Sequence, residues 1–234
     1  MNIVHLRGTV FSDPKHDMVK GVERLQFVLA CRSETPVPSV IVDYDDTFKC
    51  NIQVRAYENK AVECWNNLYR GAYIKDLYGH IMTYSYGHYS VHINGIDLSE
   101  IGSESEEYPA QNEVRLSGYM ANDGWLNHYD LEGKLSDHLL PPSEIGAVEK
   151  KFMLAAVPDL RAKKRGEGDD CVAFPRIKCF GELAEEVNRH GKGDRINYLR
   201  GMIFTWYCKN GRRRREYAIL AEEIRWEGKK VKKT

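Results

Sequence analysis

Short runs of alternating hydrophobic and polar residues recur along this chain, with the period of two that half-buried strands give. Near the start, Val4, Leu6 and Val10 fall on one side of such a run. Further strands are expected over residues 25–30, 51–57, 73–84 and 89–98, with a turn around Gly87. Between the third and fourth strands, Ala61, Trp65 and Leu68 have the i, i+4, i+7 spacing of one helix face. Residues 1–100 therefore predict three strands, a helix and two more strands.

The second half of the chain repeats the first. The pattern N-x-V-x-L-x-G occupies residues 2–8 and again residues 112–118, and the apolar run 27–30 is matched by 152–155. Five later positions also match in order: Gly71, Ile74, Gly79, Ile81 and Thr83 correspond to Gly193, Ile196, Gly201, Ile203 and Thr205. Such a repeat indicates two copies of one structural unit. In the second copy we expect a helix over 182–190 and final strands over 195–207 and 216–226.

Five strands with one helix between the third and fourth is the arrangement of the OB fold, a small Greek-key barrel. The sequence thus predicts a mainly β protein with two tandem OB folds. The expected boundaries are 1–100 for the first OB fold, 101–111 for an acidic polar linker, 112–227 for the second OB fold and 228–234 for a basic tail. The second fold carries a long insertion at about 121–148.

Each unit resembles the bacterial single-stranded DNA-binding protein (SSB) family. The resemblance rests on the N-x-V-x-L-x-G pattern, Asp13-Pro14, the run 27–30, and the strand-to-helix segments 56–62 and 179–185. The chain departs from the family in carrying two OB folds and in lacking the acidic C-terminal tail. Eight positions separate Gly71 from Gly79, and Gly193 from Gly201, one more than is usual in the family. A β-bulge shared by both units would explain this spacing.

Composition and charge narrow the class of protein. The 234 residues are 42% hydrophobic and 29% charged, as in globular proteins. No apolar run of 18 residues and no signal-peptide pattern is present, so we expect a cytoplasmic protein without membrane association. The formal charge of zero is unevenly distributed, because residues 112–234 carry 24 Lys and Arg against 19 Asp and Glu. The second half is therefore expected to be the better partner for a polyanion.

Single-strand binding without sequence preference needs aromatic faces for bases and cations for phosphates. The third strand of the second unit is expected to present Phe174, Arg176, Lys178 and Phe180 on its outer side, and that of the first unit Arg55 and Tyr57. The hairpin between the last two strands adds Tyr84, Tyr86 and Tyr89 in the first unit, and Trp206, Tyr207, Arg212, Arg213, Arg214 and Arg215 in the second. For the aromatic residues, the alternative is packing against a neighbouring loop. For the arginine hairpin, the alternatives are a solvated charged turn or an arm that touches another subunit.

Catalytic and metal-binding motifs are not expected from the sequence. The six cysteines form no C-x-x-C pair and are interpreted as reduced, mostly buried thiols. Asp43, Asp45 and Asp46 lie together, but no histidine or further carboxylate follows at a fixed spacing. His80 and His88 likewise lack a partner pair. We therefore expect a protein that is not an enzyme and has no cofactor.

The resemblance implies sequence-independent binding and protection of single-stranded DNA in replication, recombination or repair. It also implies four OB folds per assembly, which two copies of this chain supply, and replication or recombination proteins as partners. One alternative is an OB-fold interaction scaffold of a primosome or recombination complex, with DNA contact secondary. Another is a nuclease that uses the acidic loop around Asp43.

Overall fold

The computed structural model describes residues 1–31, 37–41, 50–84, 88–98, 101–102, 110–157, 172–208 and 214–227. The first half contains β1 (Asn2–Val10), β2 (Lys15–Val19), β3 (Val22–Cys31), β4 (Cys50–Tyr57), α1 (Glu58–Asn67), β5 (Tyr73–Tyr84), β6 (His88–Ile96) and β7 (Ile101–Gly102). The second contains β8 (Gln111–Met120), β9 (Trp125–Asp130), a 3-10 turn (Pro142–Glu144), β10 (Ile145–Ala156), β11 (Arg176–Phe180), α3 (Gly181–Val187), β12 (Arg195–Cys208) and β13 (Arg214–Trp226). Among these residues, neither helix has the length and apolar content needed to cross a bilayer.

Each half closes into a barrel of five main strands. In the first, β1 pairs with β3 and β5, β3 with β4, β4 with β6 in parallel, and β6 with β5. In the second, β8, β10, β11, β13 and β12 pair in the same way, again with one parallel pair between β11 and β13. The same phenylalanine position is buried in both barrels, as Phe27 on β3 and Phe152 on β10. The predicted tandem OB folds are confirmed.

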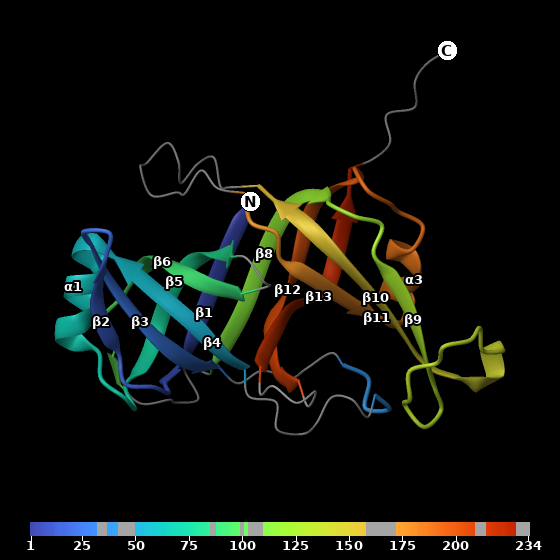
Figure 1. The fold of residues 1–234 in the computed structure, drawn as a ribbon, viewed down its shortest axis with the longest axis horizontal. Helices are drawn as coiled ribbons and strands as arrows, with labels where there is room; N and C mark the ends of the chain where they lie inside the picture. Colours follow the sequence, from blue (N-terminus) through green and yellow to red (C-terminus); the bar gives the residue numbers. More distant parts are fainter. Residues whose placement is uncertain are drawn as a thin grey trace, which may run out of the picture.

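The two barrels are joined through their first strands. β1 and β8 run antiparallel from Asn2 opposite Leu116 to Arg7 opposite Gln111. This pairing merges both barrels into one continuous 13-stranded sheet, with β1 and β8 side by side at its centre (Figure 1). Val4 and Val114, the same position of the repeat, lie opposite each other in the pairing and are fully buried. The repeat therefore forms an approximate twofold relationship within one chain.

The expected shared bulge is present in both barrels. The pairing of β5 with β6 shifts register between Tyr78 and Gly79, and that of β12 with β13 shifts between Arg200 and Gly201. A Cβ atom on Gly79 would lie 2.1 Å from the His92 carbonyl oxygen, and one on Gly201 would lie 2.1 Å from that of Leu220. Only glycine fits such a close backbone approach. This explains Gly79 and Gly201, whereas Gly71 and Gly193 adopt left-handed backbone, with φ of +94° and +92°.

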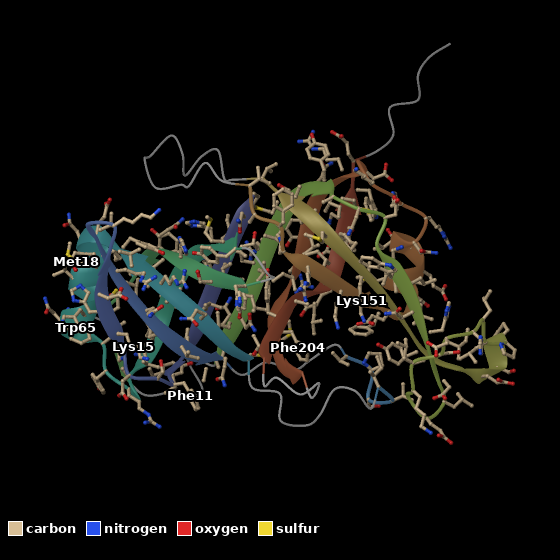
Figure 2. All side chains as sticks on the ribbon, in the orientation of Figure 1. Phe11, Lys15, Met18, Trp65, Lys151 and Phe204 are labelled. Carbon is tan, nitrogen blue, oxygen red and sulfur yellow. The ribbon has the colours of Figure 1, made fainter. Side chains whose placement is uncertain are left out.

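Trp65 does not lie on the buried face of α1, where the helical spacing had placed it. The buried residues of this helix are Ala61 and Cys64, followed by Leu68 just after its end. Trp65 is 46% exposed and its ring stacks on His16 of β2 at 5.4 Å. Figure 2 shows Trp65 at the first-barrel end of the molecule, far from Lys151 on the second barrel. The prediction was wrong because β2, an extra strand paired with β3, supplies this side of the helix with its own contact.

In the second barrel, the predicted helix is present but has different bounds, and additional strands occur. Helix α3 ends at Val187, three residues before the expected end. The insertion at 121–148 contains β9, which pairs with β10 from Ile145 to Lys151 just as β2 pairs with β3 in the first barrel. β7 lies within the segment expected as a linker and pairs with β5. β2 and β9 form the two ends of the continuous sheet.

Candidate nucleic-acid interface

Four residues on the outer side of β4, β5 and β6 form a connected aromatic and cationic cluster, here named the first-barrel face: Arg55, Tyr57, Tyr84 and His92. The guanidinium carbon of Arg55 lies 4.8 Å above the centre of the Tyr84 ring. Tyr57 and His92 have ring centres 5.0 Å apart at an interplanar angle of 50°. The parallel pairing of β4 and β6 sets Arg55 directly opposite His92. These residues come from three strands and meet because the barrel closes there.

Hydrogen bonds hold the Tyr84 side chain in place on the first-barrel face. Its hydroxyl lies 2.6 Å from Nε2 of His92 and 3.1 Å from the Ser90 hydroxyl. Partial burial raises the pKa of Tyr57, and the neighbouring Tyr84 adds to the shift. Tyr57 therefore stays neutral at physiological pH and keeps a polarisable ring beside a permanent cation, Arg55. Such a surface offers a stacking partner for a base and a counterion for a phosphate.

Beside this face, the cation of Arg24 is already neutralised. Its Nε and Nη2 atoms donate to the two carboxylate oxygens of Asp17 at 2.9 and 2.6 Å. Arg24 lies opposite Tyr57 in the pairing of β3 with β4. The hydrogen bond to Arg24 lowers the pKa of Asp17, so the pair stays ionised over the physiological range. Arg55, by contrast, forms no ion pair with a carboxylate among the described residues.

The outer side of the second barrel has a different character, because a buried carboxylate lies in its middle. Glu149 of β10 is fully buried and accepts hydrogen bonds from Asn127 and the Tyr129 hydroxyl at 3.0 and 2.9 Å. The ammonium groups of Lys151 and Lys178 lie 2.8 and 3.0 Å from its two oxygens. Burial raises the pKa of Glu149, but the attraction of Lys178 and Lys151 outweighs it and lowers the pKa to about 2.

This cluster corrects the expected exposure of Lys178. Its side chain is only 9% exposed and forms an ion pair with Glu149, so it is not a free outward cation. β9 causes the difference, because it supplies Asn127 and Tyr129, which cover the outer side of β10. Arg176 keeps its expected place on this side of β11 and is half-buried. Whether nucleic acid contacts Lys178 or Arg176 stays a prediction.

Residues 37–41 of the first barrel, here named the strap, lie against the second barrel. Ile41 is 3% exposed and forms a small apolar cluster with Tyr129 and Ala147. Val37, Val40 and Phe180 pack against this cluster. Phe180, expected as an open stacking residue, is therefore half-buried and in contact with apolar neighbours. The strap belongs to the connection between β3 and β4, and Figure 1 shows it as the blue segment near β9.

Two further candidates lie where the barrels meet. The ring of Tyr89 lies 3.8 Å from that of Tyr217 on β13, centre to centre, which occupies one of its faces. The backbone N–H of Phe174 donates to the Thr83 hydroxyl of β5 at 2.8 Å, and the Phe174 side chain is 44% exposed. Phe174 precedes β11 rather than lying on it, yet stays open to solvent. Tyr89 is consequently a contact between the barrels, whereas Phe174 remains accessible.

The remaining candidates lie partly or wholly outside the described residues. Trp206 and Tyr207 are in β12, and Arg214 and Arg215 are in β13, but only their backbones are described. Tyr86, Arg212 and Arg213 lie outside the described residues, as do Asp43, Asp45, Asp46 and the basic tail. Within the described backbone, Tyr207 lies opposite Arg215 and Trp206 opposite Glu216, so β12 and β13 bring both groups to one end of the hairpin.

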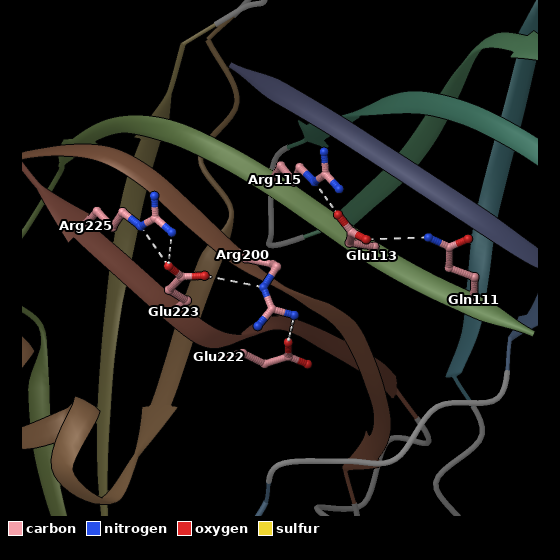
Figure 3. Close-up of polar contacts among 7 residues, drawn as sticks. All are labelled: Gln111, Glu113, Arg115, Arg200, Glu222, Glu223 and Arg225. Carbon is pink, nitrogen blue, oxygen red and sulfur yellow. Dashed lines mark hydrogen bonds and ion pairs between the residues drawn. The ribbon is translucent and has the colours of Figure 1, made fainter.

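The solvent side of β8, β12 and β13 carries arginines that are paired with glutamates. Figure 3 shows Glu113 with Arg115, and Glu223 between Arg200 and Arg225. Arg200 also lies 2.8 Å from a carboxylate oxygen of Glu222. Each arginine of this set has a carboxylate partner. Their ion pairs with glutamates thus distinguish these arginines from Arg55.

Sequence reasoning missed His92 and Glu149. His92 lies on β6, where the sequence predicted DNA contacts only in the hairpin that precedes it. The parallel pairing of β6 with β4, which sets His92 opposite Arg55, is not visible in local periodicity. Glu149 follows the insertion, and an acidic residue at an outward position reads as solvated. A usable signal was the single charged residue between Val148 and two lysines.

The described part of the chain shows no cluster of three or more His, Cys, Asp or Glu side chains that could hold a metal ion. His80 and His92 lie near each other, with ring centres 5.4 Å apart. Cys31, Cys50, Cys64 and Cys179 are buried, reduced thiols. Burial raises the pKa of Cys64 and Cys179 to about 12, so these thiols stay protonated and unreactive.

The two barrels, joined through β1 and β8, define a tandem OB-fold protein. No protein-family model matches the sequence, and no curated protein matches it either. Among solved structures, the wild-type single-stranded DNA binding protein from Thermus aquaticus is similar at a TM-score of 0.66 and 19% identity, covering 97% of this chain and 93% of that chain. A deletion mutant of the same protein gives 0.67 and 18%, covering 97% and 94%.

A second SSB from Mycobacterium smegmatis aligns with 45% of this chain and 97% of its own, at 20% identity and a TM-score of 0.33. The two Thermus aquaticus structures extend over nearly the whole length of both chains. The resemblance to the bacterial SSB family is therefore confirmed for the fold, including its tandem form.

Proposed function

We propose that this protein binds single-stranded DNA without sequence preference, and that the first-barrel face is its main contact surface. The observation that carries the proposal is the arrangement of Arg55 over Tyr84, beside Tyr57 and His92. A base stacked on an aromatic side chain contributes about 1–3 kcal/mol, and every base has a suitable face. An arginine without a carboxylate partner can meanwhile hold the phosphate between two stacked bases.

The structural neighbours support the same function, because both Thermus aquaticus structures are described as single-stranded DNA binding proteins. We propose that this chain coats and protects single strands in the cytoplasm during replication, recombination or repair. It would act by binding alone, without catalysis or a cofactor. Arg176, Phe174 and the arginine hairpin would extend the contact toward the second barrel.

A parallel titration tests the proposal. Labelled oligo-dT, the same-length RNA and a duplex are titrated with protein at several salt concentrations, and binding is followed by fluorescence anisotropy. Single-stranded DNA should bind more tightly than duplex, and its affinity should fall as salt rises because phosphate contacts release counterions. Equal affinity for single strand and duplex would refute single-strand binding.

We further propose that two chains assemble, so that four OB folds act together. Light scattering of the purified protein should give twice the 27.0 kDa chain mass. A monomer that still binds oligo-dT would remove the dimer from the proposal and leave DNA binding in place.

The occupied face of the second barrel favours one alternative, an interaction scaffold with secondary DNA contact. The strap and the Glu149 ion pairs leave this barrel a poorer single-strand surface than its sequence predicted. A scaffold would bind oligo-dT only at micromolar concentrations or above in the titration. Tight binding that depends on Tyr57 would instead support the main proposal.

A further inference from the structure

The strap packs against the second barrel through a buried side chain, Ile41. Ile41 is 3% exposed although it lies in the connection between two strands of the first barrel. Its neighbours Tyr129 and Ala147 are 3% and 8% exposed and come from β9 and β10. Within the strap, the Ile41 N–H donates to the Pro38 carbonyl at 3.0 Å, which gives the segment its own turn.

The strap covers the part of the second barrel that corresponds to the first-barrel face. Phe180 and Tyr57 both form the N-terminal boundary of the helix that follows the third barrel strand, α3 in one barrel and α1 in the other. The Tyr57 ring lies against His92 of its own barrel, whereas Phe180 packs against the cluster that contains Ile41. The two equivalent positions thus differ in what covers them.

The cations of this side are also engaged. Lys178 and Lys151 both pair with Glu149, so a phosphate arriving here would have to compete with a buried carboxylate. Phe180 packs against an apolar cluster, and the two lysines beside it share one carboxylate, which lowers the charge of the three groups to +1. Two independent contacts therefore oppose nucleotide binding on this part of the second barrel.

We propose that the strap is an intramolecular competitor of nucleic acid on the second barrel. The closed state leaves the first-barrel face to bind first, and a single strand long enough to continue past it displaces the strap from Phe180. This inference rests on the proposed function and adds its regulation. The apparent affinity of the second barrel is its intrinsic affinity multiplied by the fraction of molecules in which the strap is released. Loosening the strap raises that fraction and therefore raises the apparent affinity.

A double-mutant cycle tests the proposal with the full chain. Ile41→Ser removes apolar contact from the strap, and Val62→Ser, at a 40% exposed aliphatic position on α1, is the matched control. With oligo-dT of about 30 nucleotides, more than the ~4–16 that one OB fold covers, Ile41→Ser should tighten binding about tenfold. Phe180→Ala should have less than about twofold effect in the wild type, and should weaken binding about tenfold in the Ile41→Ser background.

Two results would overturn the inference. If Ile41→Ser changes neither the affinity nor the effect of Phe180→Ala, the strap does not control this surface. If Ile41→Ser weakens binding, the strap is itself a nucleic-acid contact. A wild-type protein that binds no single strand would refute the proposed function instead, so the two failures are distinguishable.

Hydrogen exchange of the wild type provides a second test that needs no substitution. The Ile41 amide, bonded to Pro38, should be protected in the free protein. Oligo-dT of about 30 nucleotides should speed its exchange, while an oligomer of about 8 nucleotides, which one OB fold can hold, should not. Unchanged protection with the long oligomer would contradict displacement of the strap.

Discussion

The side-chain amide of Asn2 forms two reciprocal hydrogen bonds with the backbone of Ile81, donating to its carbonyl at 2.9 Å and accepting from its N–H at 3.0 Å. Asn112 makes the same pair of bonds with Ile203 at 2.7 and 3.0 Å. Both asparagines are nearly buried. The amide continues the ladder between the first and fourth barrel strands beyond the paired main chain, which explains why the repeated N-x-V-x-L-x-G pattern starts with asparagine.

Replacing either asparagine should destabilise the protein without changing its surface. Asn2→Ala or Asn112→Ala leaves a buried N–H and carbonyl without a partner, which costs about 1–3 kcal/mol. Urea denaturation followed by circular dichroism measures the loss. Asn66→Ala, on an exposed position of α1, is the control and should stay within about 0.5 kcal/mol of the wild type. Equal stability of all three variants would show that the reciprocal bonds contribute nothing.

Removing single aromatic rings should show how much each barrel contributes to DNA binding. Tyr57→Ala should weaken oligo-dT binding by about 1–3 kcal/mol, roughly 5- to 150-fold, because a stacking face is lost. Phe180→Ala should have the smaller effect, since that ring already packs against the apolar cluster that includes Ile41 of the strap. The expected loss is thus larger in the first barrel, whereas the net charge of +5 on residues 112–234 favours the second barrel as the main contact.

Fluorescence anisotropy at one salt concentration provides the comparison. Tyr69→Ala is the control, because Tyr69 is 60% exposed but lies beyond the end of α1, away from the first-barrel face. A larger loss for Phe180→Ala than for Tyr57→Ala would assign the main contact to the second barrel.

The carboxylate of Glu149 should make stability depend on acid pH. Burial opposes its charge, yet Lys178 and Lys151 lower its pKa from the ordinary 4.5 to about 2 in the folded protein. The folded state therefore holds this group ionised more strongly than the unfolded chain does. The resulting stabilisation, about 3 kcal/mol, is present above pH ~4.5 and disappears as pH falls toward ~2.

Urea midpoints at pH 7, 4 and 2.5 measure this contribution. Glu149→Gln should be less stable than the wild type at pH 7, and the difference should shrink as the pH falls. Glu132→Gln removes an exposed partner of Lys134 and serves as the control, with a small effect at every pH. A constant difference between Glu149→Gln and the wild type across this range would contradict the assigned charge.

Deleting residues 229–234 should reduce affinity modestly and flatten its salt dependence. This segment carries four lysines, and each phosphate contact on a single strand adds about 0.7 to the log–log slope. Titrations of the truncated and full chains at matched salt concentrations reveal the change. Unchanged affinity and slope would indicate a solubilising end without contact, and tighter binding would indicate an inhibitory tail.

The sequence predicted most of the fold because the two units carry the same local signals in the same order. Alternation over β1, the glycines at the bulges and the matched positions in β5 and β12 each report a local constraint. Trp65 escaped the prediction because its neighbour His16 lies on β2, a strand that periodicity did not indicate. Helical spacing alone cannot show which side of a helix a distant strand covers.

The candidate site was predicted less well, for a related reason. The outward phase of β11 correctly separates Lys178 and Phe180 from the core residues Ile177 and Cys179. What covers that outer side is decided by β9 and the strap, which lie far from β11 in sequence. An outward position in a strand is therefore not equivalent to an accessible one, and only the packed structure distinguishes them.

The pairing of β1 with β8 also changes how this protein can diversify. In an assembly of identical single-barrel subunits, a substitution that closes one barrel closes every barrel. Here the two barrels are covalently linked and encoded separately, so Glu149 and Ile41 can close one while Tyr57 stays open in the other. A fixed one-to-one ratio of unlike halves is thereby guaranteed in every molecule, and each half is free to specialise.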